Sequence, residues 1–317
     1  MLTTPLTARL VRALVAVALV IVVTFMFVHI VPGDPARAIL GPQASPEAVS
    51  ALRARLGLDE PIVRQFLDYV GGLVVGDWGT SVAQNVPVTT LLGSRIAPTA
   101  LLVLLSTLLT VVLTIPAATL AALHRGSFLD HSVRVLPLLG LGLPAFWFSL
   151  VLIQVFAVQL GWFPAGGYGD SPLENLHSLF LPALVTAVSI LPFTIQSLRT
   201  AMIDALDADF VAAARARNVP SSRILSRYVF RNAAIPAVVV LGLNVGWLIG
   251  NTLIVEKVFA IPGIGSLLVD ATLSRDFPVV QALALVIALF VIATNLLTEA
   301  ARVALDPRLR TVAGAAR

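Results

Sequence analysis

Long uncharged blocks alternate with shorter charged blocks along the chain. Six windows of more than 20 residues contain no Asp, Glu, Lys or Arg: 13–33, 96–124, 135–169, 175–198, 232–255 and 277–298. Since about 20 helical residues cross a hydrocarbon layer of roughly 30 Å, each window is long enough to span a membrane. Another uncharged window, from Trp78 to Ser94, is too rich in hydroxyl and amide side chains to count. The pattern predicts an all-α polytopic membrane protein with six transmembrane helices.

Composition supports the membrane class and narrows the chemistry. The chain is 58% hydrophobic and 12% charged, about half the charged fraction of a typical soluble domain. It has no cysteine, which excludes disulfides and thiol catalysis. The six windows also lack the carboxylates and amines that ion-coupled transporters and membrane-embedded enzymes usually carry. A phosphate-binding G-x-x-x-x-G-K-[ST] motif is missing, and Lys257 is the sole lysine. We therefore expect a non-enzymatic chain without a cofactor of its own.

The first window and the connection after it have separate roles. The apolar run from Ala13 to Val31 is longer than the core of a secretory signal and lacks a small-residue cleavage site, so we expect a retained anchor. In the connection 31–97, Ser45-Pro46 and Asp59-Glu60-Pro61 are typical helix starts. We expect a small external helical subdomain. It serves as a lid or as a docking surface for an external binding protein, or it packs as a cap on the spans; both interpretations stay open, and both can hold at once.

The charges predict the orientation in the membrane. If both termini are cytoplasmic, the cytoplasmic segments hold 14 of the 21 basic residues. Short cytoplasmic loops are enriched in Lys and Arg, so this division favours the assignment. The pI of about 10.3 then reflects membrane orientation, and nucleic-acid binding is the weaker interpretation.

The segment from Asp207 to Pro236 carries five arginines between two spans. Asp207 or Asp209 is suited to cap a helix, and Phe210 to Arg217 favours helix formation. Asn218 and then Pro220 supply a left-handed stop and a helix breaker. The sequence predicts a short cytoplasmic helix suited to docking a soluble partner. Each arginine alone also fits a residue that faces lipid head groups or solvent.

The fifth window contains two residue patterns. Gly242, Gly246 and Gly250 recur every four residues, which favours close helix packing. The polar or aromatic side chains that accompany them are candidates for a translocation path; they are Asn244, Trp247, Asn251 and Thr252. Because buried amides also serve as interhelical hydrogen-bonding groups, packing and path lining both remain open.

These motifs resemble those of the membrane permeases of bacterial ABC importers, in the dipeptide, oligopeptide and nickel branch. Ala212 to Asn218 is similar to the family pattern E-A-A-x-x-x-G, with Asn218 at the usual glycine. The resemblance covers nearly the whole chain. It includes the runs Val31-Pro32-Gly33-Asp34-Pro35, Gly76-Asp77-Trp78-Gly79, Val255-Glu256-Lys257-Val258-Phe259 and Arg275-Asp276-Phe277-Pro278.

The resemblance implies a type I ABC importer permease in the bacterial inner membrane. It implies residues 1–31 as the first transmembrane helix and 32–97 as the external subdomain. Residues 98–305 would be the permease core with coupling loop 200–232, and 306–317 a cytoplasmic tail. The residues expected to couple the chain to ATPase subunits are Asp209, Phe210, Ala213, Ala214, Arg215, Arg217 and Asn218.

The same resemblance implies the partners and the solute. We expect a second, paralogous permease, two ATPase subunits that bind ATP and Mg, an extracytoplasmic solute-binding protein and membrane lipid, but no nucleic acid. The expected solute is a di- or oligopeptide, while nickel chelates, glutathione and oligosaccharides are alternatives within the family. A secondary transporter or a membrane-embedded enzyme is the alternative from another class.

Overall fold

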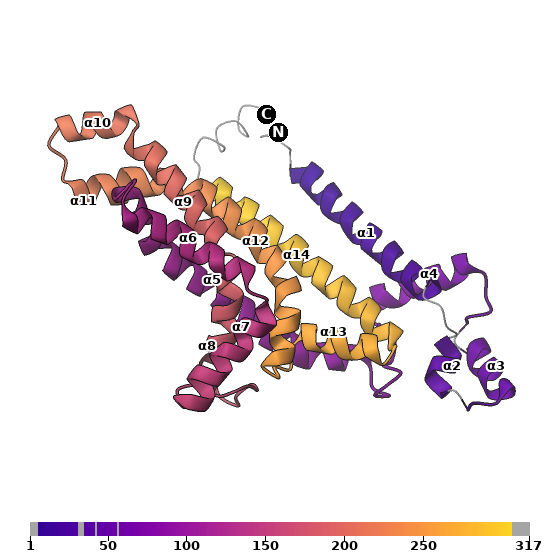
Figure 1. Cartoon of the computed structure of the whole chain (residues 1–317). Helices are drawn as coiled ribbons and strands as arrows, with labels where there is room; N and C mark the ends of the chain where they lie inside the picture. The colour runs from indigo at the N-terminus through magenta and orange to yellow at the C-terminus, as the bar shows by residue number, and fades with distance from the viewer. Residues whose placement is uncertain (1–5, 31–34, 42, 56, 306–317) are drawn as a thin grey trace. The chain divides into compact units, whose positions relative to one another are not determined.

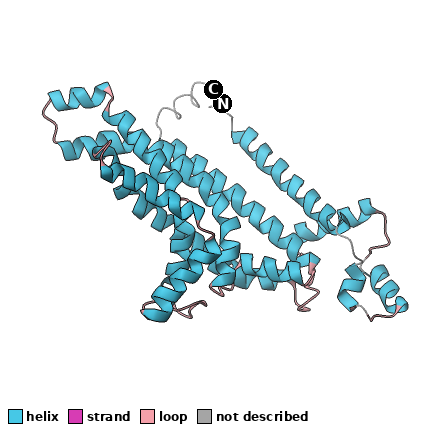
Figure 2. Ribbon diagram, viewed as in Figure 1, coloured by secondary structure: helices cyan, strands magenta, loops and turns pink. Residues whose placement is uncertain are grey.

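The chain is helical throughout the part that the structure describes. The structure is a computed structural model, and it describes residues 6–30, 35–41, 43–55 and 57–305. Figure 2 shows helices joined by loops. An isolated bridge between Thr80 and Pro87 is the β interaction found in these residues. The prediction of an all-α protein is confirmed.

Two compact units divide the described residues. The larger unit comprises Pro98–Pro262 and residues 291–305, and the smaller unit comprises residues 6–97 and 263–290. Two of the three boundaries fall within long helices, α5 (Val88–Leu123) and α14 (Phe277–Leu305), and the third, between Pro262 and Gly263, lies in the link between two helices. Each unit is described separately below.

The larger unit contains most of the helices that Figure 1 draws from magenta to orange. In chain order after α5 they are α6 (Phe128–Gly142), α7 (Ala145–Leu152), the π-helix η1 (Ile153–Gln159), α8 (Pro172–Val188), α9 (Leu191–Leu206), α10 (Asp209–Ala216), α11 (Ser221–Arg223), the π-helix η2 (Ile224–Val229) and α12 (Phe230–Val258). One apolar cluster of this unit joins α5, α9, α10, η2 and α12. A second joins α5, α7, α8 and the end of α12.

The smaller unit begins with α1 (Leu6–Ile30), α2 (Pro35–Leu40), α3 (Pro46–Arg55) and α4 (Ile62–Val75). It is completed by the start of α5, by α13 (Ile264–Leu273) and by the start of α14. The Ser45 hydroxyl accepts a hydrogen bond from the amide of Ala48 at 3.2 Å, so the predicted cap of α3 is present. At the second predicted start, Pro61 precedes α4 and no side chain caps it.

Three described helices are long and apolar enough to cross a membrane: Val88–Leu123, Ser221–Val258 and Phe277–Ala304. Two bent pairs raise the number to five if each pair is one span: α6 with α7–η1, and α8 with α9. In α1, the apolar stretch Val11–Met26 is shorter than these. The described residues therefore show three to five candidate spans, where the sequence predicted six.

The bends have proline at their breaks. The window 135–169 was expected to be one span, but the chain turns by 103° between α6 and α7, where Pro144 precedes α7. The window 175–198 is bent by 60° between α8 and α9, and Pro192 lies in the first turn of α9. Proline lacks an amide hydrogen and favours an extended conformation in the residue before it. The absence of charged residues marks both windows in the sequence but does not show that either is bent.

Candidate functional site

The predicted cytoplasmic helix is present as α10, and its beginning differs from the prediction. Ala208 is the N-cap residue and no side chain caps the helix. Asp209 lies in the first turn, where a carboxylate is favoured by the helix dipole. The Asp207 carboxylate instead pairs with Arg125, with a Nη1–Oδ2 distance of 3.0 Å. The prediction that Asp207 or Asp209 caps the helix is therefore wrong.

The end of α10 follows the prediction. Asn218 has a φ of 54°, in the left-handed region that glycine and asparagine adopt most readily. The amide of Asn218 donates to the Arg215 carbonyl at 2.9 Å, and the amide of Val219 donates to the Ala214 carbonyl at 3.1 Å. These two bonds form a Schellman motif. Asparagine thus supplies the backbone geometry for which the family pattern has glycine.

One face of α10 packs against its own chain. Val211 is fully buried and Ala214 is 6% exposed, and both belong to the apolar cluster with Met202 of α9 and Ile224 of η2. Figure 1 shows α10 between α9 and α11 at one end of the larger unit. Ala214 was expected to contact the ATPase, but it lies on this inner face. Its burial makes it a packing residue.

The other face of α10 is exposed. Phe210 is 41% exposed, and Asp209, Ala213, Arg215, Arg217 and Asn218 are exposed as well. Aromatic residues and arginine are enriched at protein–protein interfaces, so an exposed ring beside arginines suits a docking surface. Six of the seven predicted coupling residues therefore share an accessible surface, which we call the α10 outer face: Asp209, Phe210, Ala213, Arg215, Arg217 and Asn218.

The arginines near α10 are available to a partner. All five are exposed, and none forms an ion pair with another residue in the described part of the chain. They are Arg215, Arg217, Arg223, Arg227 and Arg231. Arginine is favoured at interfaces because its planar fork binds carboxylates bidentately. The cluster therefore offers a positive surface to an acidic partner.

A buried ion pair, not anticipated from the sequence, joins α6 to α9. Asp130 is 1% exposed and also accepts a hydrogen bond from the amide of Gly126 at 2.9 Å. Arg199 donates to both of its carboxylate oxygens. This pair fixes the helix that leads into α10. In the sequence, Asp130 precedes one apolar window and Arg199 follows another. That placement does not show that the two residues pair.

The candidate path residues on α12 do not form one surface. Trp247 is 65% exposed and Thr252 is fully buried. The Thr252 hydroxyl donates to the Ile249 carbonyl at 2.8 Å, and the Asn244 amide donates to the Val240 carbonyl at 2.8 Å. Both groups bond within their own helix. Asn251 is half-buried and makes no hydrogen bond to the described residues. Thr252 thus lies on the buried side of α12, whereas Trp247 lies on the exposed side.

The glycine stripe divides in the same way. A Cβ atom at Gly242 would overlap the side chain of Thr298 on α14, whereas one at Gly246 would lie 3.6 Å from Val291, and one at Gly250 would meet nothing within 4 Å. The close packing of α12 against α14 therefore requires a glycine at position 242. The stripe as a whole was predicted to pack, but Gly250 is exposed.

A buried carboxylate lies at the end of the same helix. Glu256 is fully buried, and the Thr99 hydroxyl of α5 donates to its Oε1 at 2.6 Å. The window 232–255 ended one residue before Glu256, so the sequence placed this residue in an external connection. Its burial marks it as part of the packing between α5 and α12.

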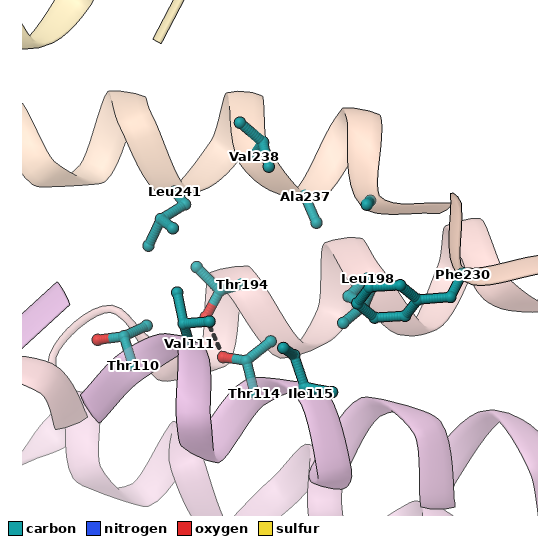
Figure 3. A pocket seen from close by; sticks show the side chains of 11 residues that line it. Thr110, Val111, Thr114, Ile115, Thr194, Leu198, Phe230, Ala237, Val238 and Leu241 are labelled. Carbon is teal, nitrogen blue, oxygen red and sulfur yellow. Dashed lines mark hydrogen bonds between the residues drawn. The ribbon is translucent and has the colours of Figure 1, made fainter. Parts of the chain in front are cut away.

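The groove in Figure 3 lies between α5, α9 and α12 and has a volume of about 90 Å³. Its walls are apolar apart from the hydroxyls of Thr110, Thr114 and Thr194. Thr114 and Thr194 bond to each other at 2.9 Å, and Thr110 donates to the Ser106 carbonyl at 2.8 Å. Because these hydroxyls are already bonded, the groove offers no charged or free polar group to a solute.

The comparisons with known proteins agree with a multi-pass inner-membrane permease without catalytic chemistry. Residues 114–311 match the family described as the binding-protein-dependent transport system inner membrane component, and residues 1–93 match the N-terminal region of such components. The chain belongs to this family. It is thus the non-catalytic membrane component of an ABC importer, whose ATPase partners bind ATP and whose solute is delivered by a binding protein.

Relatives match over almost their whole length. A Brucella melitensis permease named for peptide transport is 37% identical over 313 residues, covering 98% of this chain and 99% of the relative. The glutathione transport system permease of Escherichia coli K12 is 38% identical over 302 residues, covering 95% and 97%. Among solved structures, the inward-facing MetNI methionine ABC transporter matches with a TM-score of 0.57 at 16% identity, over 68% of this chain and 96% of that chain. This last likeness shows the fold alone.

Proposed function

We propose that this permease imports short peptides and forms half of a translocation pathway, with a paralogous permease as the other half. The α10 outer face carries the argument. It combines an exposed aromatic ring with arginines that have no ion pair among the described residues. The helix is held from behind by Val211 and Ala214. A rigid helix with a free outer face is suited to transmit ATPase movement to the spans.

In this proposal α10 is a lever attached to two spans. The Schellman motif fixes its end, and the Arg199–Asp130 ion pair holds α9 immediately before it. Movement of α10 would therefore pass to α9 and η2 rather than be lost in a flexible loop. Asp209, Phe210, Ala213, Arg215, Arg217 and Asn218 form the coupling surface.

The proposed topology has six spans and both termini in the cytoplasm. In it, the three long apolar helices and the two bent pairs, each taken as one span, supply five of them, and α1 supplies the sixth. The 199–232 connection is cytoplasmic and residues 31–97 are external. The support is the excess of basic residues in the segments assigned to the cytoplasm.

The proposed solute class rests on the relatives. One relative of 37% identity is named for peptide transport and another of 38% identity for glutathione transport. Glutathione is itself a small peptide. The alternatives within this machinery are nickel chelates and oligosaccharides. The described residues contain no group of three or more metal-binding side chains.

Reconstitution tests the proposal. The permease pair, its ATPases and its binding protein would be placed in liposomes, and uptake of a labelled tripeptide would be measured with ATP or with an imposed proton gradient. We expect tripeptide uptake to require ATP and its hydrolysis. Glutathione should compete with the tripeptide if both solutes use the same path. Uptake driven by the gradient without ATP would identify a secondary transporter instead.

A further inference from the structure

A polar cavity lies within the smaller unit. Its volume is about 680 Å³, within the range of roughly 300–1,000 Å³ that is typical of small-molecule sites. Residues from α1, α3 and α4 line it, together with the loop after α4 and the segment between α13 and α14. It is larger and far more polar than the groove of Figure 3. It is therefore the better candidate for contact with a hydrophilic solute.

Opposite charges line this cavity without neutralising each other. Asp68 of α4 and Arg275, which follows α13, are both lining residues. Both are exposed, and neither forms an ion pair with another residue of the described ranges. A site with separate positive and negative groups is complementary to a ligand that carries both charges.

The backbone at Arg275 is held in an unusual conformation. Arg275 has a φ of 55°, which is uncommon for a residue with a side chain. The next residue, Asp276, is 2% exposed and accepts hydrogen bonds from the amides of Val82 and Ala83 at 3.1 and 3.2 Å. The amides of Arg275 and Asp276 also donate to the carbonyls of Thr272 and Ala271 at 3.2 and 2.8 Å, so a Schellman motif ends α13 here and holds this backbone. The arrangement fixes the backbone of Arg275 relative to the loop that forms the facing wall.

Aromatic and amide groups complete the walls. Phe25 and Tyr69 stack with ring centroids 5.8 Å apart, and both line the cavity. Burial raises the pKa of Tyr69. Gln65 and Gln281 add amides to the lining. Apolar area with a few oriented polar groups is typical of small-molecule sites.

We propose that this cavity binds a small zwitterionic solute, with the ammonium group at Asp68 and the carboxylate at Arg275. The inference rests on the proposed function, because a short peptide carries both charges at its two ends. It adds a site on the permease itself, in the part of the chain assigned to the external side. The cavity would receive solute there before it enters the spans.

Direct binding tests the proposal. The complete complex, without binding protein, would be placed in nanodiscs, and binding of labelled trialanine would be compared with that of its N-acetylated and its C-amidated forms. We expect Arg275→Gln to weaken trialanine binding roughly tenfold, as for the loss of one charge-assisted hydrogen bond, without weakening binding of the amide. Asp68→Asn should weaken trialanine equally without affecting the acetylated form. Arg64→Gln is the matched control, since Arg64 lies on α4 and pairs with Glu60 at 3.5 Å outside the cavity lining.

Two results would overturn the inference. One is equal binding of all three ligands to the unmodified complex, and the other is no detectable trialanine binding. Uptake in the liposome assay separates this failure from failure of the proposed function. If ATP-driven uptake persists unchanged in Arg275→Gln and Asp68→Asn, the cavity is not a solute site although the protein imports peptides. If the intact system takes up no peptide, the proposed function itself fails.

Discussion

Arg199 donates to both oxygens of Asp130, with Nε–Oδ1 and Nη2–Oδ2 distances of 2.6 and 2.7 Å. Asp130 is 1% exposed and Arg199 is 11% exposed, so water screens the pair little. Two charges 69 residues apart thereby connect the start of α6 to α9, about two turns and a short link ahead of α10.

Asp130→Asn should destabilise the permease strongly. Loss of one partner leaves the other charge buried and unpaired, which typically costs about 3–5 kcal/mol. Thermal unfolding of the purified complex would measure the effect. Asp207→Asn is the control, because the Asp207–Arg125 pair is 68% and 63% exposed, and such pairs contribute roughly 0–1 kcal/mol. Equal melting temperatures for the two variants would show that the buried pair contributes little.

At Asn218 the expected effect depends on the side chain. Asn218→Gly should be nearly neutral, because glycine adopts the observed φ of 54° without strain. Asn218→Val should cost roughly 1–2 kcal/mol, since a β-branched residue disfavours positive φ. We expect solute-stimulated ATP hydrolysis to fall with valine and to persist with glycine. Full coupling with valine would contradict the role of the Schellman motif in holding α10.

Gly242 and Gly250 provide a matched pair on one helix. Gly242→Ala should reduce the yield of folded complex, because its Cβ would overlap Thr298, whereas a Cβ at Gly250 meets no atom within 4 Å. Gly250→Ala should be neutral or slightly stabilising, since alanine favours a helix over glycine by about 1 kcal/mol. Gly246→Ala should also be tolerated, with Val291 at 3.6 Å. A normal yield for Gly242→Ala would show that α12 and α14 separate readily.

Single-cysteine labelling tests the orientation in the membrane. The chain has no native cysteine, so a cysteine introduced at Ser221 is the sole thiol. We expect an impermeant reagent to label Ser221→Cys only when it reaches the cytoplasmic face, and to label Asp68→Cys only from outside. The opposite labelling pattern would invert the proposed topology.

The sequence predicted features that depend on local chemistry. The left-handed stop at Asn218 and the cap at Ser45 follow from the intrinsic preferences of those residues, and the structure confirms both. The start of α10 was wrong because Asp207 is the C-cap residue of α9 and Ala208 is the N-cap residue of α10, and the local pattern did not indicate where one helix ends and the next begins. The 103° bend between α6 and α7 was missed for a similar reason, since a window without charges looks the same straight or bent.

The candidate site was predicted only in part. Spacing placed Ala214 with Ala213, but only packing against Met202 and Ile224 decides that Ala214 lies inside. The division of the glycine stripe depends likewise on where Thr298 falls, 56 positions from Gly242. The cavity with Asp68 and Arg275 joins segments far apart in the chain, so no local motif could indicate it.

The most direct measurement of the coupling role is disulfide cross-linking between α10 and the ATPase. Single cysteines would replace Ala213 on the α10 outer face and Ala214 on the inner face, in complexes whose ATPase carries one cysteine in its docking groove. We predict that Ala213→Cys cross-links to the ATPase and that this cross-link blocks ATP-driven uptake until it is reduced. Ala214→Cys should not cross-link, because Ala214 is only 6% exposed. A cross-link from Ala214→Cys alone, or none from Ala213→Cys in an assembled complex, would contradict the account.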